Sequence, residues 1–174
     1  MYGLGVKRRS SVIVEGVERA PHRALLRALG LVDEEFSKPL IAIANSWNEV
    51  VPGHIHLNII GRKVKDGVRN GGGTPLEFNT IAVCDGLAMG HEGMRFSLVS
   101  REVIADSIEI MIEAHRFDGL IALSSCDKIE PGMMMAVARL NIPSIFLNGG
   151  PMYSGRLGDR RLSTGDVFEA VGRY

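Results

Sequence analysis

Two aspartates and a lysine come within a few residues after short apolar stretches of the sequence. Asp85 ends one such stretch, and Asp127 and Lys128 follow another. Carboxylate oxygens are the ligands that a hard divalent cation such as Mg²⁺ prefers. Two carboxylates held close together share a proton, bind a cation or repel each other. Asp85 and Asp127 are therefore a candidate Mg²⁺ pair, and the alternative is that each aspartate caps the helix that follows it.

Cys126 stands between an apolar stretch and a Pro131-Gly132 turn that opens a predicted helix. Backbone N–H groups and the helix dipole at such a position favour a thiolate, which binds metals and attacks electrophiles. The alternative is a small buried apolar residue, a common role of free cysteine. Cys84, between Val83 and Leu87, is assigned that structural role.

The histidines are weaker candidates for binding a metal or a substrate than the aspartates and Cys126. His54 and His56 lie two residues apart near the start of a predicted helix. Side chains at this spacing point to different faces of a helix, so the pair is not expected to chelate one ion. His91 lies in a glycine-rich loop, where contact with a substrate is one alternative.

Four short apolar runs, bounded by Gly, Pro, Asn or Ser, alternate with longer segments of helical periodicity. This alternation predicts an α/β fold, a parallel sheet flanked by helices in three layers. Because the runs are nearly continuous, both faces of the sheet should be covered. Ligands of such sheets bind outside the carboxyl ends of the strands, where the polar residues above lie. The predicted strands cover residues 40–44, 78–83, 120–123 and 144–147.

Helices are predicted where apolar residues recur every three or four positions. Gly71 to Gly73 end the first helix after the first strand, and Ser97 or Ser100 caps the next. A short helical run near the end of the sequence, 166–171, has few partners for its apolar side. We therefore expect residues 1–174 to be a fragment of a longer protein. The other predicted helices cover residues 21–30, 55–68, 99–116 and 132–140.

The composition is that of an ordinary globular domain, with 45% hydrophobic residues and 20 Lys+Arg against 20 Asp+Glu. A zero net charge argues against binding nucleic-acid phosphates. No signal peptide and no run of eighteen apolar residues is present, so no membrane role is expected. With only two cysteines, a disulfide framework is excluded, and we expect a cytoplasmic protein.

The segment Cys126-Asp127-Lys128-Ile129-Glu130-Pro131-Gly132-Met133-Met134-Met135-Ala136 resembles a signature of the dihydroxy-acid dehydratase and phosphogluconate dehydratase family. Further segments resemble the same family in the same order, over about residues 19–152. Residues 45–54 are closer to its dihydroxy-acid branch, and a sugar-acid dehydratase is the alternative. The matching segments include 52–57, 77–80, 85–94, 100–102, 140–143 and 149–152.

The resemblance implies an iron–sulfur cluster, 2Fe-2S or 4Fe-4S, with Cys126 as a ligand. It also implies Mg²⁺ bound by Asp85, Asp127 and Lys128, with Lys128 carried as a carbamate. A free ammonium would repel the metal, whereas a carbamate oxygen attracts it. Some members place a cluster cysteine where this chain has Gly53, so the chain supplies one recognisable cluster thiolate.

The resemblance further implies dehydration of 2,3-dihydroxy-3-methylbutanoate, and of its methylpentanoate homologue, to the 2-oxo acid in branched-chain amino-acid biosynthesis. The resemblance also implies that residues 1–174 form an incomplete N-terminal domain of a larger two-domain enzyme, whose proton-abstracting serine and further Mg²⁺ ligand would lie beyond residue 174. No catalytic base is therefore expected in this chain, which alone should be inactive. Members of the family are typically homodimers, so the resemblance also implies a homodimer that acts on a small-molecule substrate. A truncated, non-catalytic remnant is the remaining alternative.

Overall fold

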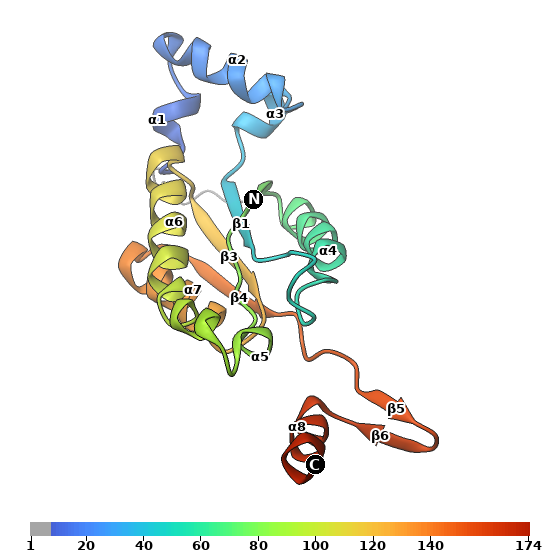
Figure 1. Cartoon of the computed structure of the whole chain (residues 1–174). Coiled ribbons are helices and arrows are strands. Elements are labelled where there is room, and N and C mark those ends of the chain that lie inside the picture. The colour runs from blue at the N-terminus through green and yellow to red at the C-terminus, as the bar shows by residue number, and fades with distance from the viewer. Residues whose placement is uncertain (1–7) are drawn as a thin grey trace.

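The computed structural model of the chain describes residues 8–174. Four parallel strands form its main sheet, in the order β2-β1-β3-β4 (Figure 1). Ala42 at the centre of the sheet pairs with Leu76 on one side and Leu120 on the other. The predicted α/β class is therefore confirmed. The strands are β1 (Leu40–Asn45), β2 (Thr74–Asn79), β3 (Gly119–Ser124) and β4 (Ser144–Asn148).

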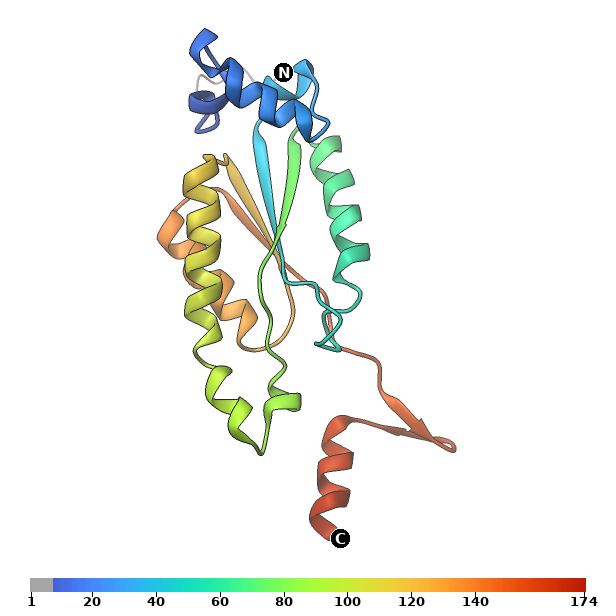
Figure 2. The same ribbon diagram turned by 45° about the horizontal axis from the view of Figure 1, so that its top comes forward.

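Helices connect the strands and form a layer on each side of the sheet. Helix α4 (Leu57–Asn70) covers one side, and α6 (Ser100–His115) and α7 (Ile129–Leu140) cover the other (Figures 1 and 2). Parallel strands need crossovers of this kind, because each chain segment must return to the same end of the sheet. The three-layer arrangement is as predicted.

The core lies between the sheet and the pair α6 and α7. Ala42, Ala44 and Ala122 present small side chains, and the stripe Ile104, Ile108 and Ile112 of α6 is fully buried. Gly132 of α7 lets the two helices approach closely, since a Cβ there would lie 3.0 Å from the carbonyl oxygen of Arg101 and 3.2 Å from the Cβ of Ile104. Close packing of α6 and α7 therefore depends on the absence of a side chain at Gly132.

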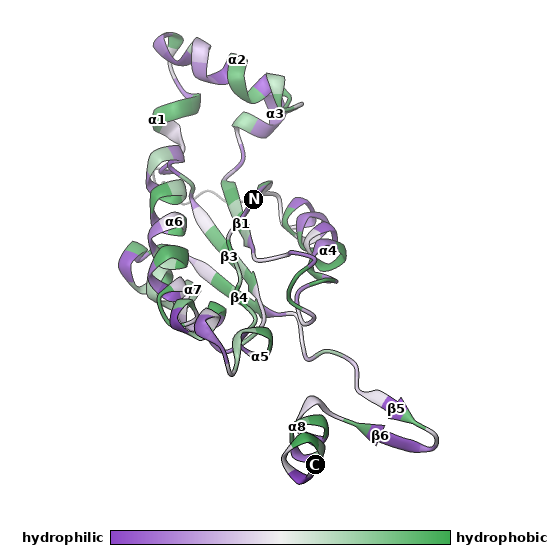
Figure 3. Cartoon of the chain, viewed as in Figure 1, coloured by the Kyte–Doolittle hydropathy of each residue, from purple (hydrophilic) through white to green (hydrophobic). Residues whose placement is uncertain are grey.

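The prediction that both faces of the sheet are covered is wrong for the last strand. Ile145, Phe146 and Leu147 of β4 are exposed, although their run is as apolar as those of the central strands. Strand β4 lies at the edge of the sheet, and its main contact is with β3. The hydrophobic colouring along β4 in Figure 3 shows this apolar edge.

The second strand is displaced from its predicted position. Strand β2 covers Thr74–Asn79, whereas residues 78–83 were predicted, and residues 80–83 have no regular structure. The N–H groups of Thr74 and Thr80 donate to the carbonyl oxygens of Pro39 and Asn45. The backbone N–H groups of even-numbered residues in β2 therefore point toward β1. Pro75 therefore points its nitrogen away from β1, and an edge strand tolerates proline in that position.

Most helix predictions are confirmed within a few residues. Helix α2 (Ala20–Ala28) has Pro21 in its first turn, and α4 ends at the predicted Gly71. The prediction that Ser97 or Ser100 caps α6 is wrong. The N-cap residue is Val99, whose side chain makes no capping hydrogen bond. Ser97 instead donates its hydroxyl to the carboxylate of Asp85.

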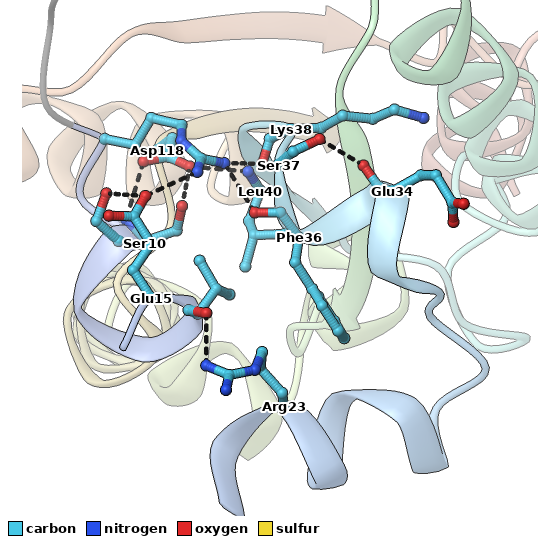
Figure 4. A network of polar contacts seen from close by, with 12 residues as sticks. Ser10, Glu15, Arg23, Glu34, Phe36, Ser37, Lys38, Leu40 and Asp118 are labelled. Carbon is cyan, nitrogen blue, oxygen red and sulfur yellow. Dashed lines mark hydrogen bonds and ion pairs between the residues drawn. The ribbon is translucent and has the colours of Figure 1, made fainter. Parts of the chain in front are cut away.

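Short helices lie at the end of the sheet where the strands begin. They are α1 (Ser11–Val14), a 3₁₀ turn at Val17–Arg19, α2 and α3 (Asp33–Phe36). Asp118, just before β3, accepts hydrogen bonds from the Ser10 N–H at 3.0 Å, the Ser10 hydroxyl at 2.6 Å and the Leu40 N–H at 2.8 Å (Figure 4). This carboxylate fastens the leading segment to the sheet.

The last part of the chain extends away from the sheet (Figures 1 and 2). Strands β5 (Gly155–Leu157) and β6 (Arg160–Leu162) form an antiparallel hairpin, which the polar sequence did not predict. Helix α8 (Thr164–Arg173) confirms the predicted terminal helix, and Ser163 and Asp166 form its capping box. Within residues 8–174, no helix is long and apolar enough to cross a membrane.

Candidate functional site

The chain reverses its direction of winding between β1 and β3. From β1 it crosses to β2 on one side, and from β2 it crosses back over to β3 on the other. Such a switch point leaves a crevice outside the carboxyl ends of the two strands, where ligands of α/β sheets bind. The segments that follow β1 and β3 contain Gly53 and Cys126, which therefore flank this crevice.

Lys128 joins the two predicted metal ligands. Its ammonium nitrogen lies 2.7 Å from Oδ2 of Asp85 and 2.9 Å from Oδ2 of Asp127. The Lys128 and Asp85 side chains are 21% and 17% exposed, whereas that of Asp127 is 74% exposed. The structure thus brings together three of the four predicted site residues at one position.

These contacts set the ionisation of the pair. Burial acts to raise the pKa of Asp85, but hydrogen bonds from Lys128 and Ser97 and the charge of Lys128 lower that pKa below its ordinary value of 3.8. Hydrogen bonds to Asp85 and Asp127 raise the pKa of Lys128 above 10.5. Contacts with the two carboxylates therefore favour the ammonium form of Lys128.

The two aspartates follow strands that are not neighbours in the sheet, because β1 lies between β2 and β3. Residues 80–84 carry Asp85 past the end of β1, where the Asn48 side chain contacts the carbonyl of Ala82 at 3.4 Å. Neither aspartate is a helix cap, since Cys84 and Lys128 occupy the N-cap positions of α5 (Asp85–Ala88) and α7.

Cys126 has an unusual backbone conformation. Its φ of 72° lies in the left-handed region, which residues other than glycine rarely adopt. Burial raises the pKa of its thiol above the ordinary value of 9.0, and the nearby Cys84 and Asp127 raise that pKa further. These surroundings favour the protonated thiol. Binding of a metal would have to displace the proton.

A cavity of about 640 Å³ opens at the carboxyl ends of all four strands. Cys126 and Cys84 both lie on its wall, together with residues that are mainly apolar or glycine. Cys84 was predicted to be structural, and only the strand order reveals that it faces the same space as Cys126. The lining also includes Val51, Pro52, Gly53, Gly86, Leu87, Ser125, Asn148, Gly150, Pro151, Met152 and Thr164.

The histidines support the loops around this cavity. His54 is fully buried, and its ring nitrogens lie 2.7 Å from the carbonyl oxygens of Ser46 and Ser125. The His56 ring contacts the carbonyl oxygen of Gly149 at 2.7 Å. His54 therefore links the segments after β1 and β3, a role that the spacing of the histidines could not reveal. His91 contacts its own loop, through the carbonyl of Leu87.

The position around Lys128 and the cavity beside it offer different ligand atoms to a metal. Within residues 8–174, no group of three or more His, Cys, Asp and Glu side chains is close enough to hold a metal ion. Two carboxylates surround the Lys128 nitrogen, and a carbamate there would add the oxygen ligand that Mg²⁺ requires. The cavity beside them offers two thiols, which suit iron, zinc or copper(I).

A parallel α/β domain with ionisable side chains gathered at its switch point is typical of an enzyme domain that binds a small ligand. A family model described as "Dihydroxy-acid/6-phosphogluconate dehydratase N-terminal" matches residues 38–174. The chain belongs to this dehydratase family.

Curated relatives of the chain have names that belong to the same family. The chain is 62% identical over 164 residues to a dihydroxy-acid dehydratase of Pyrococcus abyssi, a match that covers 94% of this chain and 30% of the relative. It is 58% identical over 166 residues to the enzyme of that name from Caldicellulosiruptor saccharolyticus, with 95% and 30% covered. The enzyme of the same name from Methanosarcina barkeri is 57% identical over 166 residues, with the same coverage. The chain thus spans about 30% of the length of these relatives.

Proposed function

We propose that this chain is the metal-binding N-terminal part of a dihydroxy-acid dehydratase that acts on 2,3-dihydroxy-3-methylbutanoate and its methylpentanoate homologue. In this reaction C2 loses a proton and C3 loses hydroxide, which together make water. The enol that remains tautomerises to the 2-oxo acid, in the first case 3-methyl-2-oxobutanoate. The observation that carries the proposal is the meeting of Lys128, Asp85 and Asp127 beside a cavity that contains Cys126.

Asp85, Asp127 and a carbamate on Lys128 would hold Mg²⁺. Both carboxylates already lie within 3 Å of the Lys128 nitrogen, at 2.7 and 2.9 Å. Ser97 donates to Oδ1 of Asp85, which fixes the orientation of this carboxylate. Such a support is what a ligand to a metal needs, because it restricts the carboxylate to one orientation.

Cys126 would hold an iron–sulfur group in the adjoining cavity. When they are bound, this group supplies a Lewis acid for the 3-hydroxyl of the substrate and Mg²⁺ supplies charge for its carboxylate. His54 supports the Cys126 loop through the carbonyl of Ser125, and the left-handed backbone at Cys126 sets the direction of its side chain. The wall of the cavity is mainly apolar, and such surroundings strengthen electrostatic contacts with a group bound there.

No residue of this chain is assigned as the base that removes the C2 proton. We propose that this group comes from the portion of the polypeptide for which the relatives extend beyond the match, since the chain covers 30% of their length. The 174-residue chain alone should accordingly show no turnover. Turnover by the purified chain would contradict this division of roles.

A sugar-acid dehydratase is the second candidate, because the family model covers both 6-phosphogluconate and dihydroxy-acid dehydratases. The test is to assay the full polypeptide, as its source makes it, on the branched dihydroxy acid and on aldonic acids side by side. We expect formation of the 2-oxo acid from the branched substrate to have a kcat/KM at least about tenfold higher, roughly 1.4 kcal/mol of preference in the transition state. A preference for an aldonic acid would replace the first candidate by the second.

A further inference from the structure

The two cysteines reach one cavity from separate parts of the chain. Cys84 comes at the end of the irregular segment that follows β2, and Cys126 comes in the loop that follows β3. Both side chains are partly exposed, and both line the cavity of about 640 Å³ described above. No disulfide joins them. Both thiols are therefore free to bind the same ligand.

A glycine stands beside each thiol. A Cβ placed on Gly53 would lie 3.6 Å from Sγ of Cys126, and a Cβ placed on Gly86 would lie 3.8 Å from Sγ of Cys84. Side chains at these two positions would therefore extend from the cavity wall into contact with the sulfur atoms. The two glycines leave the space around the thiols free.

The chemistry of the wall suits a soft metal centre. Among the described residues that line the cavity, Cys84 and Cys126 are the ionisable side chains, and the carboxylates lie outside its lining. Hard cations such as Mg²⁺ prefer oxygen ligands, whereas thiolates in a largely apolar surrounding select iron–sulfur groups, zinc or copper(I). The sulfur ligands are thus separated from the oxygen ligands of Asp85 and Asp127.

We infer that Cys84 is a second thiolate ligand, together with Cys126, of an iron–sulfur group bound in this cavity. The inference rests on the proposed function for the identity of the group, and it adds a ligand from this chain. Both thiols lose their protons on binding, and each sulfur forms one bond to iron.

The test compares wild-type polypeptide, as its source makes it, with the Cys84→Ser and Cys126→Ser variants after anaerobic reconstitution with ferrous iron and sulfide. Iron and acid-labile sulfide are counted per polypeptide, and visible absorption and Mössbauer spectra are recorded. For Cys84→Ser we expect either a loss of at least half of the bound iron or a shift of the sulfur-to-iron charge-transfer bands. A cysteine with a merely structural role would change neither the bands nor the Mössbauer parameters of the retained iron.

A second measurement does not depend on how the variants fold. Wild-type protein with and without its iron is treated with iodoacetamide, and the modified cysteines are identified by mass spectrometry. We expect Cys84 and Cys126 to be protected together when iron is bound and to react together after iron is removed. Reaction of Cys84 at the same rate in both forms would overturn the inference.

The outcomes separate the inference from the proposed function. If the wild type binds iron and sulfide and Cys84→Ser has the same iron content and spectra, the Cys84 ligand is wrong while the proposed function stands. If the active wild type contains zinc or no metal in place of iron, both the Cys84 inference and the proposed iron–sulfur group are wrong.

Discussion

Lys128 Nζ lies 2.7 Å from Oδ2 of Asp85, although 43 residues separate them in the sequence. The same nitrogen lies 2.9 Å from Oδ2 of Asp127. The ammonium ion therefore occupies the position between the carboxylates that a divalent cation would need. Mg²⁺ and the lysine charge compete for the same oxygens, and a change at the lysine must accompany metal binding.

This competition predicts that Mg²⁺ and bicarbonate bind cooperatively. Carbamylation replaces the ammonium by an anionic oxygen, so each ligand should increase the affinity of the other, typically by about 5-fold or more. Isothermal titration with Mg²⁺ at several bicarbonate concentrations measures the coupling. Lys128→Arg keeps a positive charge and cannot form the carbamate, so its weak Mg²⁺ binding should not respond to bicarbonate. Equal Mg²⁺ affinity of the wild type with and without bicarbonate would contradict the carbamate.

The stability of the metal-free protein should depend on pH through Asp85. The pKa of this carboxyl is lowered in the folded state, so its contribution is present above the unfolded pKa and is lost as the pH falls through the folded pKa, below 3.8. Lys128→Met removes the main favourable partner and should lower the free energy of unfolding at neutral pH by about 1–2 kcal/mol. The difference from wild type should shrink in acid.

Urea unfolding at pH values from neutral to acid checks this dependence. Lys63→Met is the matched control, because Lys63 contacts Asp66 at 3.6 Å with side chains 81% and 57% exposed. An exposed pair of this kind contributes at most about 1 kcal/mol and usually less. A Lys128→Met variant with an unchanged difference from wild type at every pH would argue against the Asp85 contact.

Asp118 should be important for attachment of the leading segment. Three donors from Ser10 and Leu40 converge on its two oxygens (Figure 4). Asp118→Asn replaces one oxygen by a donor, so at least one buried N–H or O–H loses its acceptor, at a cost of about 1–3 kcal/mol. Hydrogen exchange should accelerate at residues 10–14. Asp33→Asn, at an exposed pair with Arg27, is the control and should have little effect.

The same substitution at two helical glycines should have opposite effects. In Gly132→Ala the new methyl group would lie 3.0 Å from the Arg101 carbonyl oxygen, so α6 and α7 must move apart at a cost of about 1–3 kcal/mol. In Gly67→Ala nothing lies within 4 Å of the added carbon. Alanine favours a helix over glycine, so this variant should gain up to about 1 kcal/mol. Thermal unfolding of both variants gives the comparison, and equal effects would contradict the close approach of the two helices.

The sequence was sufficient for the α/β class, because apolar runs and helical periodicity are local properties of the chain. It was insufficient for β2, where Pro75 suggests a break but is accommodated at the outer side of an edge strand. The exposed β4 was also missed, since an apolar run does not reveal which helix reaches it.

The sequence predicted which residues belong to the candidate site, but not how they are arranged in space. Asp85 and Asp127 could be named from their places after apolar runs, and Lys128 from the family resemblance. Their contact at one nitrogen depends on the path of residues 80–84 past β1. Cys84 was assigned a structural role, because nothing local to it shows that the chain brings it to the cavity of Cys126. These relationships depend on strand order, which a single sequence does not specify.

We propose above that a metal site built on Asp85 serves the dehydration of a branched dihydroxy acid. The most direct test is the initial rate of 2-oxo acid formation from 2,3-dihydroxy-3-methylbutanoate, at saturating Mg²⁺, by the full wild-type polypeptide and by Asp85→Asn with matched iron content. We expect a readily measured wild-type rate and a loss of about 100-fold or more in the variant, the size expected when electrostatic stabilisation in an active site is removed. Equal rates, or no turnover by the iron-loaded wild type, would contradict it.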